Sequence, residues 1–470
     1  RLIIQGNMQI AAGSIFTNGT LYMAETAAIT ASATGTSIVG VVHAANIFTK
    51  KAAGIYLAGQ PFNQSVVFND WTSKPKLFYN NAVLNTDSFS IESGWKPFDF
   101  AGDSSANSWK KYQGIQWHVL SNQNNDNLPA YLSGPIQMGT QQIFLSQSGN
   151  GFNVIANPYL SPVNTGSFTK AKSVSNYKYI WNPLMGNDGG YMVLPFAQKH
   201  ILNPFEAYIV QTDSSLENEI TISEASKSVE WNKGLIEDYK EVVGYYATID
   251  LLNNQVLQDR LILREQAGSK NGKDSLDANK LMNPGINLFS RSADGVKLAI
   301  DTRVLQAQTI VPIELINASV GNYTFQIHEA FMPSEFKLVL YDTYTNNSMP
   351  LIKDSLYQFS ITADSLSKVS NRFYIGKYIP KATSPLSNLL TVKLYPNPAT
   401  SEIKVSIKAN SAANSSVKLF NMAGTLIKTV ELGNIQQGLI SIPIATISNG
   451  QYFIQVTSGA LQQNIPFIKQ

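Results

Sequence analysis

The chain has 470 residues, a formal net charge of +3 and only 14% charged residues. Its length exceeds that of one ordinary hydrophobic core, so several domains are expected. The basic residues form no dense block, which argues against a nucleic-acid or anionic-membrane partner. Cysteine is absent, which excludes disulfides, thiol catalysis and cysteine-based metal sites.

Hydrophobic runs are short throughout the sequence. The longest, Ser37–Phe48, contains His43 and falls short of the roughly 20 residues that a membrane-spanning helix needs. We therefore expect no transmembrane segment. The chain begins at Arg1 without a methionine or a signal peptide, so we expect it to be processed or to be the C-terminal part of a longer protein.

Residues 1–59 consist of short apolar patches separated by glycine and small residues. Met8–Ala11 and Leu21–Ala24 can be superimposed, a repeat that is typical of stacked rungs in a β-solenoid. Ordinary β-hairpins give the same pattern, and both interpretations stay open. We predict a β-rich segment here, either the end of a solenoid or a set of hairpins.

Residues 60–234 and 235–380 each predict an antiparallel β-sandwich or jelly-roll-like domain. Both blocks contain short alternating runs bounded by Gly, Pro and Asn, for example Asn322–Ile327 and Lys337–Leu340. Such alternation gives each strand one buried and one exposed face.

A short segment in the second of these blocks, Ser275–Met282, predicts a helix. Asp274 or Ser275 is suited to cap its first turn. Oxygen-bearing side chains are also frequent in this stretch: Asn271, Asp274, Asp277 and Asn279. These could hold calcium in a loop, but their spacing does not fit an EF-hand, and capping is the simpler interpretation.

Residues 381–388 are small, polar and proline-bearing, which is typical of a linker. The block that follows, 389–470, contains seven short predicted strands: Leu390–Tyr395, Ile403–Ile407, Ser416–Asn421, Leu426–Glu431, Leu439–Pro443, Gly450–Thr457 and Leu461–Ile468. Seven strands in so short a block predict an immunoglobulin-like β-sandwich. The whole sequence thus predicts an all-β, multidomain protein whose domains unfold separately.

The final block opens on two prolines around an asparagine, Tyr395–Pro398. Proline fixes φ and disfavours helix in the residue before it, so Tyr395 should enter an extended turn with its ring capping the sandwich. Direct contact with a receptor is the alternative. Near the end, Pro466 cannot donate a backbone hydrogen bond, which predicts that the last strand lies at a sheet edge. A free edge is suited to capture by a partner through strand addition.

This final block resembles the type A C-terminal sorting domain of cargo proteins of the type IX (Por) secretion system of Bacteroidetes. Four elements carry the resemblance: Tyr395–Pro398, Leu419–Gly424, Ile447–Val456 and Phe467–Lys469. Ile447 replaces the usual leucine, and Pro466–Phe467 departs from the usual basic tail. The matching sorting-motif residues are Tyr395, Pro396, Asn397, Pro398, Gly424, Gly450, Tyr452, Phe453 and Lys469.

The resemblance implies export across the outer membrane to the cell surface or the medium. It implies as partners the type IX translocon, its PorV-like outer-membrane shuttle barrel, and a surface peptidase or sortase that removes the domain. Three Asp-Ser-Leu triplets, at Ser275, Ser355 and Ser365, resemble O-glycosylation acceptors of exported proteins in the same bacteria.

Familiar catalytic signatures do not occur in the sequence. It contains neither a G-x-S-x-G elbow nor a phosphate-binding G-x-x-x-x-G-K. His328-Glu329 lacks the second histidine of a zincin site, and the other histidines, His43, His118 and His200, are scattered. A pair of glycosidase carboxylates cannot be read from spacing. We expect no enzymatic activity, no cofactor and no metal.

Dense aromatic residues are the remaining clue to a binding surface: Trp95, Trp109, Trp117, Tyr131, Tyr159, Tyr179, Trp181 and Tyr191. Aromatic faces stack on sugar rings or partner chains, but core packing is the favoured explanation. We expect a secreted cell-surface protein acting in adhesion, gliding motility or another surface interaction, with a glycan or surface ligand. The alternative is a set of accessory β-modules of an exported hydrolase or carbohydrate-binding protein whose catalytic part lies upstream.

Overall fold

The protein is built from β-strands, as the sequence predicts. The computed structural model describes residues 2–5, 8–10, 14–23, 29–31, 37–45, 52–68, 76–81, 94–98, 100, 108–119, 131–213, 218–232, 244–305, 309–332, 338–370, 372–377, 390–422, 424–459 and 461–470. These residues contain strands, the short 3-10 helices η5 (Thr165–Ser167), η6 (Glu224–Ser226) and η7 (Ser365–Lys368), and no α-helix. None of their helices has the length and apolar character needed to cross a membrane. The predicted linker 381–388 lies outside the described residues.

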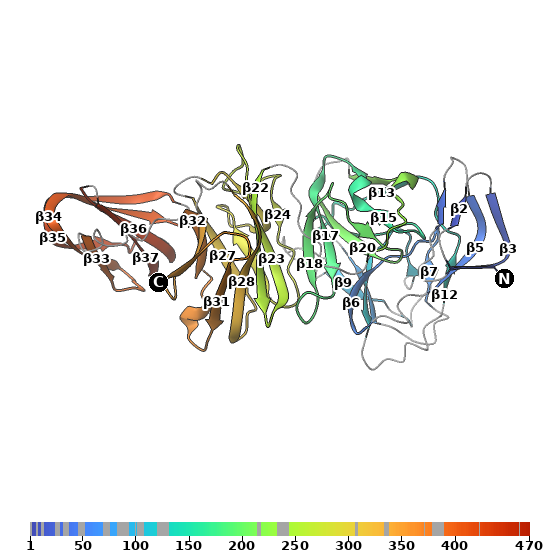
Figure 1. Cartoon of the computed structure of the whole chain (residues 1–470), viewed down its shortest axis with the longest axis horizontal. Coiled ribbons are helices and arrows are strands. Elements are labelled where there is room, and N and C mark those ends of the chain that lie inside the picture. The colour runs from blue at the N-terminus through green and yellow to red at the C-terminus, as the bar shows by residue number, and fades with distance from the viewer. Residues whose placement is uncertain are drawn as a thin grey trace.

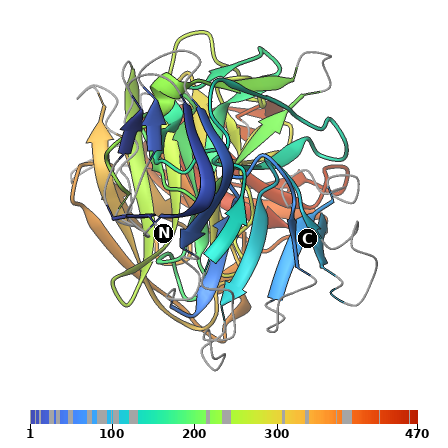
Figure 2. The ribbon, with the colours of Figure 1, turned by 90° about the vertical axis from the view of Figure 1, so that its right-hand side faces the viewer.

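The units follow one another along a single long axis (Figure 1). The N-terminal strands occupy one end, the block of residues 141–222 and the block of residues 244–377 form the middle, and the final block occupies the other end. Figure 2 looks along this axis from the N-terminal end and shows the first strands in front of the rest. The chain therefore forms an elongated succession of β-units.

The first strands pair in parallel. β3 (Ser14–Met23) lies between β1 (Leu2–Ile4) and β5 (Ser37–Ala45), and β2 (Met8–Ile10) pairs with β4 (Ile29–Ala31). Parallel stacking is the arrangement that solenoid rungs use, whereas hairpins would be antiparallel. The predicted superposition of Met8 on Leu21 is wrong, because Met8 pairs with Ile29 and Leu21 pairs with Leu2 and Val42.

Strand pairing crosses the predicted boundary after residue 59. β5 pairs with β12 (Tyr131–Gly134), and β6 (Gly54–Ala58) pairs with β11 (Ile115–Val119). One hydrophobic core accordingly reaches from Leu21 to Phe205. The remaining strands of this region are β7 (Val66–Val67), β8 (Lys76–Asn80), β9 (Trp95–Pro97) and β10 (Ser108–Trp109). The domain limits stay a prediction.

Residues 141–222 form antiparallel sheets around a second core. The main sheet has the order β14-β20-β17-β18 and a smaller one the order β13-β21-β16, while β15 pairs with β19. The strands are β13 (Gln141–Phe144), β14 (Phe152–Ala156), β15 (Val163–Asn164), β16 (Thr169–Lys170), β17 (Val174–Asn182), β18 (Gly190–Pro195), β19 (Ile201–Leu202), β20 (Ala207–Thr212) and β21 (Glu219–Ile222). Side chains from both sheets, such as Ile155, Tyr208 and Ile220, share that core.

Residues 244–377 form an eleven-stranded sheet, whose buried side chains from opposite ends share one core. The strands are β22 (Tyr245–Asn253), β23 (Val256–Glu265), β24 (Ala278–Asn279), β25 (Asn287–Arg291), β26 (Lys297–Arg303), β27 (Ile310–Ile316), β28 (Gly321–Phe331), β29 (Leu338–Asp342), β30 (Asn347–Pro350), β31 (Leu356–Ile361) and β32 (Phe373–Lys377). Pairing is antiparallel except between β23 and β26, which run parallel. The predicted purely antiparallel arrangement is therefore wrong at this pair.

The predicted helix at Ser275–Met282 is wrong. The segment forms a turn followed by strand β24, which pairs with β26. Asp274 Oδ1 accepts a hydrogen bond from Leu276 N at 2.7 Å, and Asp277 Oδ1 accepts one from Thr302 N at 2.7 Å. Aspartate side chains that bond to nearby backbone compete with helix formation, and here they hold the segment extended.

The same segment fastens the two middle blocks together. Tyr177 Oη donates to the Leu276 carbonyl at 2.6 Å and accepts from Arg264 Nη1 at 2.8 Å. Tyr179 Oη donates to the Asn279 carbonyl at 2.9 Å, and Leu281 is buried in the preceding block's apolar cluster. Buried hydrogen bonds and apolar contacts of this kind couple the blocks, so we expect them to unfold together and not separately.

We predict that Tyr177→Phe lowers the thermal midpoint of the coupled middle blocks by a few °C. The substitution removes the hydroxyl shared by the Leu276 carbonyl and the buried Arg264 guanidinium, both of which keep Thr302 as a partner, so it costs about 0.5–1.5 kcal/mol. Differential scanning calorimetry on the whole chain measures it, with Tyr395→Phe, at an exposed tyrosine, as the matched control. Two separate middle transitions in the unchanged protein would contradict the coupling.

Candidate functional site

The final block contains five strands and not the predicted seven. They are β33 (Leu390–Tyr395), β34 (Glu402–Asn421), β35 (Leu426–Pro443), β36 (Gly450–Ser458) and β37 (Leu461–Lys469). β34 and β35 each join two of the predicted strands into one. No proline or glycine interrupts β34, and register shifts beside Lys408 and Ser415 take up the bend in place of a loop.

Strand β34 connects the two halves of this block. Its first part pairs with β33 and its last part pairs with β36, while β35 follows it on the other side. Alternate side chains such as Ile403, Val405, Val417 and Leu419 enter one core. Gly424, with φ at 77°, makes the turn between β34 and β35, as predicted.

The last strand, β37, lies at a sheet edge, as Pro466 predicts. It pairs with β36 alone in the sheet order β33-β34-β36-β37. The turn that follows β33 covers one half of the outer side of β37. Asn397 Oδ1 accepts from Ile468 N at 2.9 Å, and Asn397 Nδ2 donates to the Pro466 carbonyl at 3.3 Å. Ala399 N donates to the Ile468 carbonyl at 2.8 Å, and Gln470 N donates to the Ala399 carbonyl at 2.8 Å.

The outer side of β37 is therefore divided into a closed and an open half. Backbone groups in a strand point alternately to either side, so the outward positions continue from Ile468 and Pro466 to Asn464 and Gln462. Pro466 has no N–H to offer there. Strands β33 and β35 are edge strands as well, since β34 is the sole neighbour of each in the described sheet. The block thus has three edge strands, and the turn covers part of β37 alone.

Several sorting-motif residues have structural roles here. Tyr452 is buried, and its hydroxyl donates to the Ser448 carbonyl at 2.8 Å. Lys469 is buried, and its Nζ donates to Asn449 Oδ1 at 3.0 Å. Phe453 stacks on Phe420 with ring centroids 5.0 Å apart.

Tyr395 departs from the prediction. Its side chain is 45% exposed, so the expected capping of the sandwich end by its ring is wrong. The residue that packs in this turn is Ala399, which is fully buried.

Residues 393–470 match the family described as the secretion system C-terminal sorting domain. The chain carries a type IX sorting domain. This domain marks the protein as cargo of the type IX secretion system and directs its export across the outer membrane to the cell surface or the medium. The sorting domain accordingly interacts with the type IX secretion machinery.

Comparisons over the whole chain add little. No curated protein matches the chain significantly. Two similar solved structures are dimeric latent PorU from Porphyromonas gingivalis (12% identity, TM-score 0.16) and a Salmonella alpha-2-macroglobulin variant (10% identity, TM-score 0.15). The matches cover 75% and 89% of this chain but only 36% and 28% of those chains. Both scores are too low to inform fold or function.

The three serines of the Asp-Ser-Leu triplets lie in different settings. Ser275 and Ser365 are exposed, and each follows an aspartate whose carboxylate accepts from the leucine N–H, at 2.7 Å and 2.9 Å. Ser355 is half-buried, and its carbonyl accepts from Ile327 N at 2.9 Å. Turn formation therefore accounts for two triplets, and O-glycosylation stays a prediction.

The aromatic residues singled out in the sequence fill cores. Six are buried: Trp109, Trp117, Tyr159, Tyr179, Trp181 and Tyr191. Trp95 and Tyr131 are half-buried. Sequence reasoning missed Phe144, whose side chain is 75% exposed. The signal that could have found it is the alternation of β13, where Ile143 and Leu145 point into the core and Phe144 therefore points out.

Three of the described histidines lie on different strands, and His328 Nδ1 lies 3.6 Å from Asp250 Oδ2. His43 lies on β5, His118 on β11 and His328 on β28, and none of the described residues forms a group suited to a metal ion. Asp277, weighed as a calcium ligand, instead bonds backbone N–H groups of Thr302 and Asp274.

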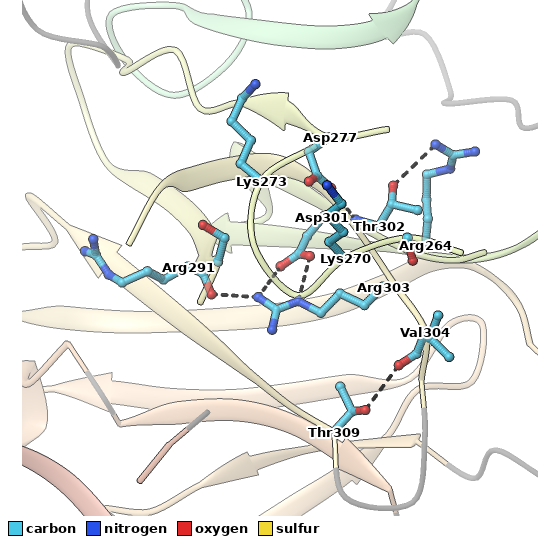
Figure 3. A network of polar contacts seen from close by, with 12 residues as sticks. Arg264, Lys270, Lys273, Asp277, Arg291, Asp301, Thr302, Arg303, Val304 and Thr309 are labelled. Atoms are coloured by element: carbon cyan, nitrogen blue, oxygen red, sulfur yellow. Dashed lines mark hydrogen bonds and ion pairs between the residues drawn. The ribbon is translucent and has the colours of Figure 1, made fainter. Parts of the chain in front are cut away.

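A buried polar network surrounds Asp277 (Figure 3). Arg303 bonds both carboxylate oxygens of Asp301, at 2.8 Å and 2.9 Å, and its Nη2 donates to the Arg291 carbonyl at 2.6 Å. Burial raises the pKa of Asp277 to about 7, and the Asp301 and Asp274 carboxylates add to that rise against the two backbone hydrogen bonds. The network holds the segment that joins the two middle blocks.

We predict that the Asp277→Asn variant loses less stability than the unchanged protein when the pH rises from about 5 to about 8. A carboxyl whose folded pKa lies above its unfolded pKa stabilises the fold most at low pH, and this contribution falls as pH rises to about 7. After solvent screening the effect is on the order of 1 kcal/mol. Urea unfolding at both pH values measures it, with the exposed Asp188→Asn as control. An unchanged pH dependence in Asp277→Asn would refute this role.

We predict that Asn397→Ala destabilises the sorting domain by about 0.5–1.5 kcal/mol, because two hydrogen bonds to β37 are lost at a site that water reaches. Urea unfolding of the sorting domain within the whole chain measures this. Asn464→Ala, on the open half of the same strand, is the matched control and should leave stability unchanged. Equal effects of the two substitutions would show that the turn does not hold β37.

Proposed function

We propose that the chain is a cell-surface interaction protein of the adhesin type, delivered outside the cell by its sorting domain. The match of residues 393–470 to the sorting domain carries the delivery half of this proposal. The succession of β-units along one axis supports the other half, since an elongated protein holds its far end away from the point of attachment (Figure 1).

The secretion machinery engages the sorting domain by strand addition in this proposal. Unpaired backbone groups at a strand edge bind an extended partner strand through main-chain hydrogen bonds. The open edges are β33, β35 and the Gln462–Asn464 half of β37, because the Asn397–Ala399 turn occupies the remainder of β37. The finer partners in the proposal are a PorV-like shuttle barrel and a surface peptidase.

The body acts by binding and not by catalysis in this proposal. Three of its buried carboxylates are committed to cationic partners: Asp259 to Lys280, Asp342 to Arg372 and Asp301 to Arg303. These pairs have side chains at most 5% exposed. Charged groups in such pairs are held by their partners and are poorly placed to act on a substrate.

A second candidate is a role as accessory modules of an exported hydrolase or a carbohydrate-binding protein. The observation that favours it is a surface cavity beside the exposed Phe144. Under this candidate the body binds a polysaccharide and keeps an attached catalytic part close to it.

Deletion of residues 389–470 tests both halves of the proposal in a bacterium that has the type IX machinery. We predict that the truncated body folds but stays in the periplasm, and that the cells lose adhesion to the surfaces that the full-length strain binds. Fractionation and a whole-cell adhesion assay measure these outcomes. A reporter fused to residues 390–470 is the control for export.

The outcomes separate the two halves. Truncated protein at the cell exterior would contradict sorting by the final domain. Full-length protein displayed at the surface, with adhesion equal to that of the deletion strain, would contradict the adhesin role and leave export standing.

A further inference from the structure

The small sheet β13-β21-β16 has an outer face with a distinct chemistry. Its inner positions, such as Ile143 and Ile220, lie in the core. Side chains alternate along each strand, so Phe144 on β13 and Thr169 on β16 project from the opposite face. Cross-strand pairing places Phe144 beside Glu219 and Thr169 beside Thr221.

A cavity of about 500 Å³ opens on this face. Its lining residues are Phe144, Thr169, Lys170, Ala171, Asn218, Glu219 and Thr221. A volume of this size suits a small ligand, on the order of 300–1,000 Å³. The lining thus combines one aromatic wall with hydroxyl, amide and carboxylate groups.

Phe144 is exposed to a degree that core packing does not explain. Its side chain is 75% exposed, the highest value among the exposed large hydrophobic residues of the described chain. Leaving a phenyl ring in water forgoes burial energy, on the order of 1.5–3 kcal/mol. The ring face is therefore available for stacking on a ligand.

The polar groups of this face are available as well. The side chains of Thr169, Glu219 and Thr221 make no hydrogen bond or ion pair with any described residue. Lys170 differs, since its Nζ donates to the Val174 carbonyl at 2.7 Å and lies 5.6 Å from the centre of the Phe196 ring. The lining groups without a described partner are thus two hydroxyls and one carboxylate, while the Lys170 ammonium keeps its charge but is held by the Val174 carbonyl.

We propose that this cavity binds one or two pyranose rings of a neutral oligosaccharide, stacked on Phe144. A pyranose ring has an apolar C–H face that packs on an aromatic ring, and a rim of hydroxyls that bond to threonine and carboxylate oxygens. The Glu219 carboxylate disfavours acidic sugars on the Phe144 ring, because it is the cross-strand neighbour of Phe144 whereas the Lys170 ammonium is held by the Val174 carbonyl. This inference deepens the proposed surface role by naming a ligand class, although the binding chemistry holds without export.

Isothermal titration calorimetry of the purified whole chain tests this site. The probes are soluble neutral hexasaccharides of glucan, mannan and xylan type, and an acidic galacturonan hexasaccharide. We expect at least one neutral hexasaccharide to bind, and Phe144→Ala to weaken it about tenfold. Phe331→Ala, at an exposed phenylalanine on β28, is the matched control and should bind as the unchanged protein does.

Glu219→Gln supplies a second readout. It keeps the shape of the side chain and removes its charge, so the neutral sugar should bind more weakly for lack of a charged acceptor while the acidic hexasaccharide gains affinity. The inference is overturned if no neutral hexasaccharide binds, if Phe144→Ala and Phe331→Ala have equal effects, or if the acidic sugar binds the unchanged protein best. None of these results bears on export, so they are distinguishable from failure of the proposed delivery.

Discussion

The hydrogen bonds between the Asn397–Ala399 turn and strand β37 are the constraint on which the sorting domain depends. A protein made of strands must pair, cover or expose every sheet edge, and an exposed edge invites pairing with any other strand. Here the turn imitates a neighbouring strand for the final residues of the chain and leaves Gln462–Asn464 open. The domain therefore has a defined free edge of limited length, and the position of that edge is set by a short motif far away in sequence.

Hydrogen bonds from a short segment also hold the middle of the molecule together. The chain has no cysteine and hence no disulfides, so its fold is held by packing, hydrogen bonds and ion pairs. Residues 274–283 place backbone and apolar groups against the preceding block, and Asp277 fixes them through two backbone N–H groups. Buried hydrogen bonds and apolar contacts therefore join the two middle blocks.

Much of the fold could be predicted from the sequence, because strands in this chain are short, alternating and bounded by turn residues. β33 begins and ends where the alternation predicts, and the glycine turn at Gly424 is confirmed. The errors share one cause: the local sequence pattern does not show which distant residues a segment contacts in the fold. The helix predicted at Ser275–Met282 gave way to carboxylates bonding distant backbone, and β34 bends through a bulge where a loop was expected.

The sequence also predicted the candidate sites only in part. The family motif located the sorting domain, but it did not reveal that Asn397 closes the edge or that Tyr395 is exposed. The aromatic clue pointed to residues that fill cores, whereas strand parity alone distinguishes Phe144 from them. The alternation of side chains identifies an exposed residue only when the strand and its buried face are already known. The cavity could therefore be found only from the structure.

Hydrogen exchange along β37 distinguishes a strand edge that is half closed by the Asn397–Ala399 turn from one that is uniformly open. Amides that bond to the Asn397–Ala399 turn should exchange slowly, and outward amides without a partner should exchange freely. The account predicts protection at Ile468 and Gln470, by about a hundredfold or more, and little protection at Gln462 and Asn464. Equal protection along the whole strand, or fast exchange at Ile468, would contradict the division of this edge into a closed and an open half.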